Sequence, residues 1–416
     1  MTVIGKRPNM STRLYRTVVR TPTRTRQASE SELDEAITHN DTANDLRRAG
    51  RLQEAEQHYR IALRHWPDCP EIHANLADTF EALGRIDEAE ASYRNAIKFN
   101  PELHEARFNL SLLLLSQGRY LEAWPLYEAR GPLFQEHGTL PFPKWAGEAL
   151  SGKSLLLLPE QGYGDTIQFV RYAPLLKALG VAQLTVACKP ELGPLLRTVQ
   201  GIDTVVTDPH ELRVHDYWES LMSLPRHFGT TPQSIPAQIP YVGVFTQRMD
   251  RWKARLPDRA LRVGLVWKGN PGHDNDAARS LPHFAELAPL LSADGVSFIS
   301  LQTGDAELEV AASGHHQNIV CLGKDIVDFA DTAAIVAQLN LVIAVDTAIV
   351  HLTGALGVAC WLMLPKTGVD WRWHRTGAQS PWYPQDMYLF RQASGGWAEQ
   401  IASVRSALDE IVRARG

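Results

Sequence analysis

The sequence of 416 residues contains no apolar run that reaches the roughly 18 residues needed to cross a membrane. It has only four cysteines, and their scattered positions do not resemble a metal site or a disulfide framework: Cys69, Cys188, Cys321 and Cys360. The net charge of −5 gives no general reason to expect a nucleic acid as a partner. These shortages predict a cytoplasmic chain with reduced cysteines, no membrane span and no nucleic-acid partner.

Acidic residues are missing from the N-terminal segment before Glu30, although the segment carries seven basic ones. It also lacks the apolar core of a secretory signal. We therefore predict a basic, disordered tail over residues 1–35. A solvated arm, or an extension upstream of a true start at Met10, is favoured over a segment that contacts an anionic surface.

A repeat with a fixed period of 34 residues follows the tail. Three residue types recur at this spacing: Gly50, Gly84 and Gly118; Ala55, Ala89 and Ala123; Tyr59, Tyr93 and Tyr127. Glycine permits the positive φ of a turn between two helices, alanine allows close helix approach, and tyrosine fills the groove. The pattern resembles the tetratricopeptide repeat over residues 36–130.

The third repeat deviates from the other two, because Pro125 falls inside its second helix and Arg130 replaces a small residue. A linker is expected over residues 131–153. Such repeats bind a protein or peptide in their concave face, or they serve as spacers; we favour binding, although no groove residue can be identified from one sequence.

Strands and helices alternate from Ser154 onward, which predicts an α/β region with parallel sheets. The expected strands cover 154–160, 183–189, 205–207, 261–268, 296–302, 319–322, 341–345 and 359–364. The expected helices cover 166–179 (kinked at Pro174), 191–199, 245–254, 282–291, 328–339, 348–356 and 397–412, and 217–228 has no assignment. Two Rossmann-like lobes follow, residues 154–247 and 248–416, with a cleft at the carboxyl ends of both sheets.

Asp165 is the first candidate for chemistry, because it follows the first strand through the turn at Gln161–Asp165. Its carboxylate can cap the next helix or act as a general base facing the cleft. Gln161 lies beside it, and Gly162 and Gly164 are expected to let a substrate approach the backbone. The third glycine of a dinucleotide motif is missing.

A second candidate site begins where the strand 341–345 meets the next helix. The free N–H groups and dipole of such a helix start bind phosphate, and Thr347 can donate to a phosphate oxygen. Asp346 precedes it, and His351 lies one turn later. The alternatives are that Thr347 is only an N-cap and His351 only a packed core residue.

A polar loop after the strand 261–268 supplies further candidates for binding an anionic donor: Lys268, Asn270, Arg279 and Ser280, with Gln302 at the end of the next strand. Its cations are expected to neutralise a departing diphosphate. The alternative is a solvated loop. Asp274–Asp276 matches an acidic metal-binding pair, but such a match is common in polar loops, and we expect no metal.

Aromatic residues are concentrated in two later segments, 370–374 and 380–384. Trp371 and Arg372 are candidates for contact with an acceptor, since indole rings stack on sugar faces. The same aromatics can equally pin the last helix to the body of the protein.

Taken together, these segments resemble the family 9 glycosyltransferases, which include ADP-heptose heptosyltransferases, and in particular a branch that carries tetratricopeptide repeats. The resemblance rests on Glu160–Phe169, Gly264–Pro271 with Arg279–Ser280, Asp346–His351 and Ser380–Pro384. It implies a GT-B fold whose C-terminal lobe binds the donor and whose N-terminal lobe binds the acceptor. At one position the family motif usually has glycine where this chain has Ala348, so the resemblance does not name the donor sugar.

The resemblance also implies an inverting transfer from a nucleotide-sugar without an obligatory metal or cofactor. Asp165 matches the base, Asp346, Thr347 and His351 match the donor-phosphate motif, and Lys268 and Arg279 lie where cations meet the leaving group. The repeats suggest a protein acceptor. The alternatives are an inactive adaptor that keeps the two-lobed frame, and epimerisation of a nucleotide-sugar.

Overall fold

The computed structural model describes residues 29–134, 140–258, 261–273, 275–393 and 396–415. Two compact units make up the chain, with the boundary between residues 138 and 139. The predicted basic tail lies outside the described residues except for its last part. There the first helix begins at Glu30, because Ser29 and Glu32 bond each other's backbone N–H groups in a capping box.

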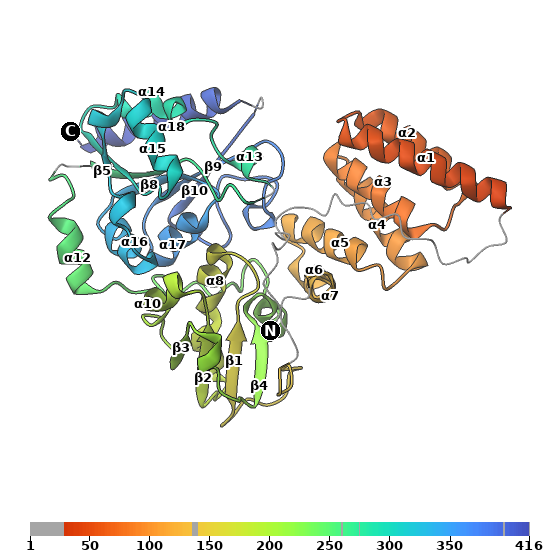
Figure 1. The fold of residues 1–416 in the computed structure, drawn as a ribbon, viewed down its shortest axis with the longest axis horizontal. Coiled ribbons are helices and arrows are strands. Elements are labelled where there is room, and N and C mark those ends of the chain that lie inside the picture. The colour runs from red at the N-terminus through yellow and green to blue at the C-terminus, as the bar shows by residue number, and fades with distance from the viewer. Residues whose placement is uncertain (1–28, 135–139, 259–260, 274, 394–395, 416) are drawn as a thin grey trace. The chain divides into compact units, whose positions relative to one another are not determined.

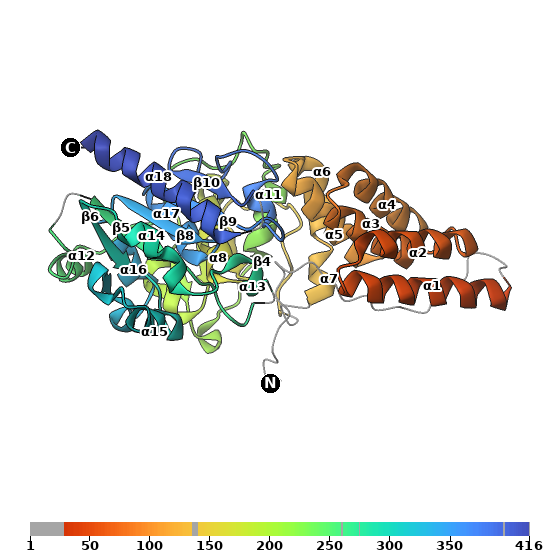
Figure 2. The same ribbon diagram turned by 90° about the horizontal axis from the view of Figure 1, so that it is seen from above.

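The first unit is an array of antiparallel helices, drawn from red to orange in Figure 1 and Figure 2. Its helices are α1 (Glu30–Arg48), α2 (Leu52–His65), α3 (Pro70–Ala82), α4 (Ile86–Phe99), α5 (His104–Ser116), α6 (Tyr120–Tyr127) and α7 (Arg130–Phe134). The turn glycines of the repeat adopt φ of +75°, +77° and +80°, as the 34-residue period predicts. The recurring alanines and tyrosines are all buried.

The third repeat is shorter than the others, as Pro125 predicts. Helix α6 has 8 residues, whereas α2 and α4 have 14 each. Arg130, at the position where the repeat has a small residue, is buried and donates from Nη1 to the Tyr127 carbonyl at 3.1 Å. Its guanidinium also pairs with Glu128 at 2.8 Å.

A four-parallel-strand sheet forms the first lobe of the second unit, in the order β3-β2-β1-β4. Its strands are β1 (Ser154–Leu158), β2 (Gln183–Ala187), β3 (Thr204–Val206) and β4 (Tyr217–Ser220). Its helices are α8 (Tyr163–Phe169), α9 (Ala173–Ala178), α10 (Gly193–Leu196) and α11 (Leu224–His227), and α12 (Thr246–Lys253) follows the lobe. Lys144 makes a bridge to Trp218, so residues assigned to the linker join this sheet.

The second lobe contains a sheet of six parallel strands in the order β10-β9-β8-β5-β6-β7. Its strands are β5 (Leu261–Val266), β6 (Val296–Ser300), β7 (Ile319–Cys321), β8 (Leu341–Val345), β9 (Cys360–Leu364) and β10 (Met387–Arg391). This is the strand order of a doubly wound Rossmann sheet. The strands β5, β6 and β7 are added in one direction and β8, β9 and β10 in the other, so the strand order reverses between β5 and β8. Ligands of such sheets bind at the carboxyl ends of the strands beside the reversal.

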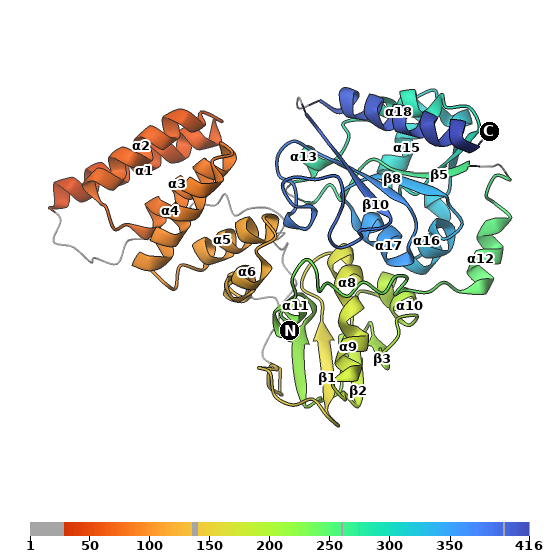
Figure 3. The same cartoon turned by 180° about the vertical axis from the view of Figure 1, so that it is seen from behind.

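Helices cover both faces of this sheet: α13 (Asp276–Arg279), α14 (Ala288–Leu291), α15 (Asp305–Ala312), α16 (Phe329–Val336), α17 (Ala348–Leu356) and α18 (Trp397–Arg415). Figure 3 shows α17 beside α8 of the first lobe. The prediction of a tetratricopeptide array followed by two Rossmann-like lobes, the arrangement of a GT-B fold, is confirmed.

Several local predictions were wrong. The expected turn at Gln161–Asp165 is the first turn of α8 from Tyr163 onward, and the expected kink at Pro174 is a break, because a 3₁₀ turn at Val170–Tyr172 separates α8 from α9. Proline starts α9, where its missing N–H costs nothing. Helix α15 and strand β10 were not predicted. No helix among the described residues has the length and apolar character of a membrane span.

Candidate active site

The start of α17 lies at the end of the fully buried strand β8. Thr347 occupies the N-cap position with φ −145° and ψ 172°, yet its hydroxyl caps no N–H group. The Thr347 Oγ1 atom is buried and has no hydrogen-bond partner among the described residues. An unpaired buried hydroxyl is costly, and this one has a donor and an acceptor that a ligand could use.

Asp346 precedes Thr347 and has a raised pKa. Burial raises the pKa of its carboxyl to about 6, and the neighbouring Asp370 carboxylate adds to the rise. Arg279, and also Arg372, oppose the increase in the pKa of Asp346 by favouring its charged form. Residues from three separate segments therefore meet at this helix start.

The polar loop after β5 brings Arg279 toward this point. Its Nε atom is buried without a hydrogen-bond partner, and its nearest described carboxylate oxygen belongs to Asp276, 3.6 Å away. A Cβ on Gly269 would lie 2.7 Å from Asp276 Oδ1 and 2.8 Å from Arg279 Nη2, so a side chain there would displace the ends of both side chains. Arg279 is thus a cation with unused donor capacity beside the start of α17.

The other loop candidates are largely engaged in holding the loop together. Ser280 Oγ accepts from Gly269 N–H at 2.8 Å and donates to Asp276 at 2.7 Å. Gln302 Oε1 accepts from the backbone N–H groups of Trp267 and Lys268, at 3.2 and 3.0 Å. These contacts indicate that Ser280 and Gln302 stabilise the conformation of the loop.

Lys268 and Asn270 also have partners within the lobe. The Lys268 ammonium pairs with Glu309 of α15, a residue that the sequence did not single out. Asn270 is exposed, and its Oδ1 accepts from Gly272 N–H at 2.9 Å. Of the two predicted loop cations, Lys268 is thus paired with a carboxylate at hydrogen-bond distance, whereas Arg279 has a buried Nε without a hydrogen-bond partner.

Asp165 lies in the first turn of α8, where its Oδ2 accepts from Gly162 N–H at 2.9 Å. Its Oδ1 accepts from Nη2 of Arg372, a residue of the second lobe, at 2.5 Å. The side chain keeps 16% of its surface exposed. Burial raises the pKa of Asp165, and the positive charge of Arg372 lowers it. Capping and access to a substrate are thus both available to this carboxylate.

Gly164 has a packing role that the sequence did not predict. A Cβ on Gly164 would lie 2.7 Å from His351 Cδ2 and 3.4 Å from Ala348 Cα. The glycine therefore allows α8 to pack against the first turn of α17. Gln161 and Gly162 lie immediately before α8, where Gly162 is exposed.

His351 is buried between the two lobes. Its ring stacks on Trp373 with centroids 5.3 Å apart, and its Nδ1 lies 3.1 Å from the Tyr383 hydroxyl. Burial lowers the pKa of His351 well below its usual range, so the ring is neutral at physiological pH. These contacts favour the packing interpretation, in which His351 sets the shape of the site.

Arg372 connects the two candidate regions. It donates from Nη1 to both oxygens of Asp370, at 3.0 and 2.9 Å, and from Nη2 to Asp165. Trp371 beside it is buried and packs edge-on against Trp382, with ring centroids 5.9 Å apart, which leaves it little surface for an acceptor. The sequence did not single out Asp370, although it stands at the head of the aromatic segment.

The described residues contain no group of three or more His, Cys, Asp or Glu side chains that could hold a metal ion. Of the acidic pair considered for a metal, Asp274 lies outside the described residues. Asp276 accepts from Ser280 and lies near Arg279.

The chain therefore has the class of architecture predicted for it, a tetratricopeptide array followed by two facing Rossmann-like lobes. The family model described as "Tetratricopeptide repeat" matches residues 40–103 and 75–131. Protein FlbA of Caulobacter vibrioides is 30% identical over 330 residues, which cover 72% of this chain. The chain spans about half the length of that curated relative, 54% of it.

Solved structures of the predicted kind are also similar to this chain. The ADP-heptose lipopolysaccharide heptosyltransferase II of E. coli matches 63% of this chain and 98% of its own, with 12% identity and a TM-score of 0.46. A family 9 glycosyl transferase from Veillonella parvula matches 59% of this chain and 88% of its own, with 12% identity and a TM-score of 0.43.

Proposed function

We propose that the second unit is a glycosyltransferase that moves a sugar from a nucleotide-diphosphate donor to a hydroxyl acceptor, with inversion and without a required metal. The observation that carries this proposal is the convergence at the start of α17 of an unpaired Thr347 hydroxyl, the partly unpaired guanidinium of Arg279 and, across the lobes, Asp165. The contact of Gly164 with Ala348 and His351 keeps α8 against that helix start.

The donor diphosphate would bind at the N-terminus of α17, where backbone N–H groups and the helix dipole favour an anion. Arg279 would offset the charge that develops on the leaving group. The carboxyl ends of β5 and β8 place this helix start at the reversal point of a Rossmann sheet, where such ligands bind.

In the transfer, the acceptor oxygen would form a bond to the anomeric carbon while its proton passes to Asp165. The bond from that carbon to the diphosphate oxygen breaks, and the nucleoside diphosphate leaves with the electron pair. Because burial raises the pKa of Asp165 above its ordinary value, the carboxylate is a stronger base than a fully solvated one.

The repeats would recruit a protein that carries the acceptor hydroxyl. This part of the proposal rests on the presence of the tetratricopeptide array in the same chain. A radiolabelled sugar should then appear on a protein of a cell extract only when the enzyme is active.

Asp165→Asn tests the base. Since the acceptor is not identified, the assay follows release of nucleoside diphosphate from a panel of nucleotide-sugars with water as acceptor. The variant should lower this rate by roughly 10²–10⁴-fold, while its affinity for the nucleoside diphosphate stays nearly the same. Asp250→Asn, at an exposed position of α12, is the matched control.

Full turnover by Asp165→Asn would show that the base is wrongly assigned. If the intact chain binds no nucleotide-sugar, the inactive adaptor is the better interpretation. A changed sugar that is still attached to its nucleotide would indicate epimerisation.

A further inference from the structure

Arg372 is held in one orientation by partners from both lobes. Its Nε donates to Gln168 Oε1 at 2.5 Å, its Nη2 to Asp165 at 2.5 Å, and its Nη1 to both oxygens of Asp370. The side chain is 6% exposed. A planar guanidinium held by three directed donors in this way fixes the position of Asp165 Oδ1, the oxygen to which its Nη2 donates.

The segment that carries Arg372 is itself fixed. Asp370 accepts from the Arg372 backbone N–H at 2.9 Å and so caps the 3₁₀ turn Trp371–Trp373. Arg391 of β10 donates to the Trp373 carbonyl at 2.5 Å. The guanidinium is thereby placed by the frame of the second lobe, whereas its carboxylate partner Asp165 belongs to the first lobe.

A second arginine, Arg171, provides a natural comparison. It is also buried and also reaches from the first lobe to the second, where its Nη1 donates to the Trp382 carbonyl at 2.9 Å. Its Nη2 donates to the Tyr241 hydroxyl at 3.0 Å, and its guanidinium lies 4.8 Å from the Tyr383 ring centroid. Uncharged groups thus hold Arg171, which joins the lobes without a carboxylate among these contacts.

The Asp165 carboxylate is therefore bound on both oxygens, Oδ1 by Arg372 and Oδ2 by Gly162 N–H. Each carboxylate oxygen accepts more than one hydrogen bond, so a lone pair on each remains for a substrate proton. The exposed 16% of the side chain is where that proton can arrive. The orientation of this remaining acceptor is set jointly by Arg372 of the opposite lobe and by Gly162 of the same lobe.

We propose that Arg372 is a positioning residue that orients the Asp165 carboxylate and keeps it ionised from across the two lobes. The role in catalysis rests on the proposed function, whereas the contact itself and its electrostatic effect do not. Arg372 thereby makes the base competent only while the two lobes are held in this arrangement.

The charges around Asp165 determine in which direction each substitution should shift its pKa. Burial raises the pKa of Asp165, Arg372 lowers it, and the carboxylate of Asp370 raises it. From α17, His351 faces α8 as a neutral ring. Asp346 lies beyond, close enough to Asp370 and Arg372 for their charges to act on its pKa.

The test measures the titration of Asp165 directly, by carbon NMR of the intact chain labelled at the aspartate carboxyl carbon. Asp165→Asn assigns the signal. Arg372→Gln should move the titration of Asp165 to higher pH, because the opposing positive charge is lost. Asp370→Asn, which keeps the capping oxygen, should move it to lower pH.

Arg171→Lys is the matched control, since it alters the other buried arginine between the lobes and should leave the titration of Asp165 in place. Arg372→Lys keeps the charge but loses the planar fork, and should restore part of the shift. If Arg372→Gln leaves the titration unchanged, or if Arg171→Lys shifts it equally, Arg372 only joins the two lobes structurally and does not position Asp165.

Activity forms the second arm. The acid limb of turnover against pH should move upward in Arg372→Gln, together with the NMR titration, and downward in Asp370→Asn. An NMR shift in a chain that turns over no nucleotide-sugar would leave the electrostatic contact standing and reject the proposed function. An active chain whose acid limb ignores Arg372 would reject the positioning role.

Discussion

A single carboxylate, Asp346, shows how burial changes a residue at the proposed site. Its pKa of about 6 means that the group is half protonated at about pH 6 and mostly ionised at pH 7. The unfolded chain would hold that proton only below about pH 4. A nucleoside diphosphate placed at the start of α17 adds negative charge beside Asp346, and so would favour the protonated form further.

The pH dependence of stability follows from this shift. Between about pH 4 and pH 6 the folded chain binds a proton at Asp346 that the unfolded chain does not. The contribution of this residue to stability is therefore greatest at low pH and is lost as the pH rises through the folded pKa.

Asp346→Asn should remove this pH dependence, because the amide does not titrate. Relative to the unaltered chain, the melting temperature of the variant should rise by roughly a few degrees between pH 4.5 and pH 7.5. Thermal unfolding at both pH values measures the difference. A constant offset between the two proteins across this range would show that the pKa of Asp346 is not raised.

At the scale of elements, the contact between α8 and α17 joins the lobes at the proposed site. Gly164 has no side chain, which allows His351 to lie against the α8 backbone. Gly354 acts similarly within the second lobe, where a Cβ would come within 2.3 Å of the Tyr383 ring. Two glycines thus set how closely these elements approach.

Gly164→Ala should destabilise the second unit by about 1–3 kcal/mol, because the new methyl group overlaps His351. Chemical denaturation measures the loss. His351→Ala should relieve part of it in the double variant, since the two residues are in contact. Gly396→Ala, with nothing within 4 Å of its Cβ, should be nearly neutral. Equal losses for both glycines would contradict the close contact.

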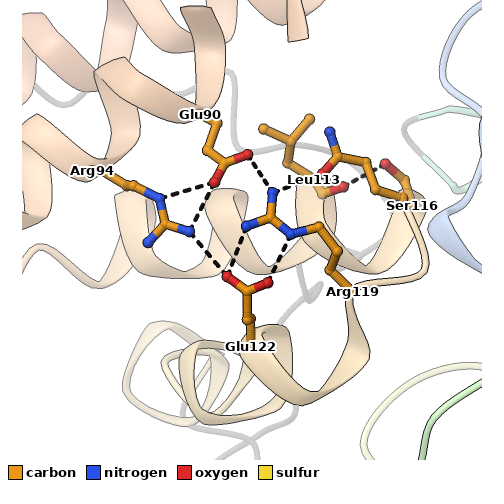
Figure 4. Close-up of polar contacts among 7 residues, drawn as sticks. Glu90, Arg94, Leu113, Ser116, Arg119 and Glu122 are labelled. Carbon is orange, nitrogen blue, oxygen red and sulfur yellow. Dashed lines mark hydrogen bonds and ion pairs between the residues drawn. The ribbon is translucent and has the colours of Figure 1, made fainter. Parts of the chain in front are cut away.

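The repeat unit has its own recurring device, a network of charges between successive repeats (Figure 4). Arg119 donates to Glu90 at 2.6 Å and to Glu122 at 2.7 and 2.8 Å. Arg94 completes the network with contacts to Glu90 at 2.8 Å and to Glu122 at 3.2 Å. Arginine and glutamate recur at all four positions 34 residues earlier, where Arg85 pairs with Glu56 and Glu88.

Arg119→Ala should lower the stability of the repeat unit by about 1 kcal/mol at low ionic strength, at the upper end for partly exposed ion pairs. High salt should reduce the difference, because it screens exposed charges. Arg64→Ala, at an exposed position of α2, serves as control. A loss that does not change with salt would mean that Arg119 acts through packing.

Elements with a strong local pattern could be predicted from the sequence. The fully apolar run of β8 and the glycine that ends α17 gave the bounds of both, and the 34-residue period gave the repeats. Helix α15 escaped because only Val310 among its residues is buried, which leaves little apolar periodicity. Gly162 and Gly164 indicated a turn, but α8 begins at Tyr163, and Gly164 lies within it against α17.

The composition of the candidate site was predictable, but its pairings were not. Asp165 and Arg372 are 207 residues apart, and no local pattern connects them. The Lys268–Glu309 pair likewise depends on how α15 packs. The sequence identified residues capable of chemistry, and only the fold decides which of them are already bound to one another.

At the scale of the whole molecule, the two units carry separable parts of the proposal. The second unit holds the proposed chemistry, and the repeat unit holds the proposed recruitment of an acceptor. A ligand that binds only the folded second unit should raise the melting temperature of that unit alone. The proposed donor site therefore can be tested in the intact chain without knowledge of the acceptor.

The most direct test is calorimetric titration of the intact chain with a panel of nucleoside diphosphates, comparing Arg279→Gln with Lys324→Gln. Both variants remove one positive charge from the second lobe, but Lys324 is exposed in the turn before α16. At least one diphosphate should bind the unaltered chain, and Arg279→Gln should weaken it by about 10–100-fold, as expected for a lost charge-assisted contact. Equal affinities for the two variants, or no binding by any diphosphate, would contradict a donor site at the start of α17.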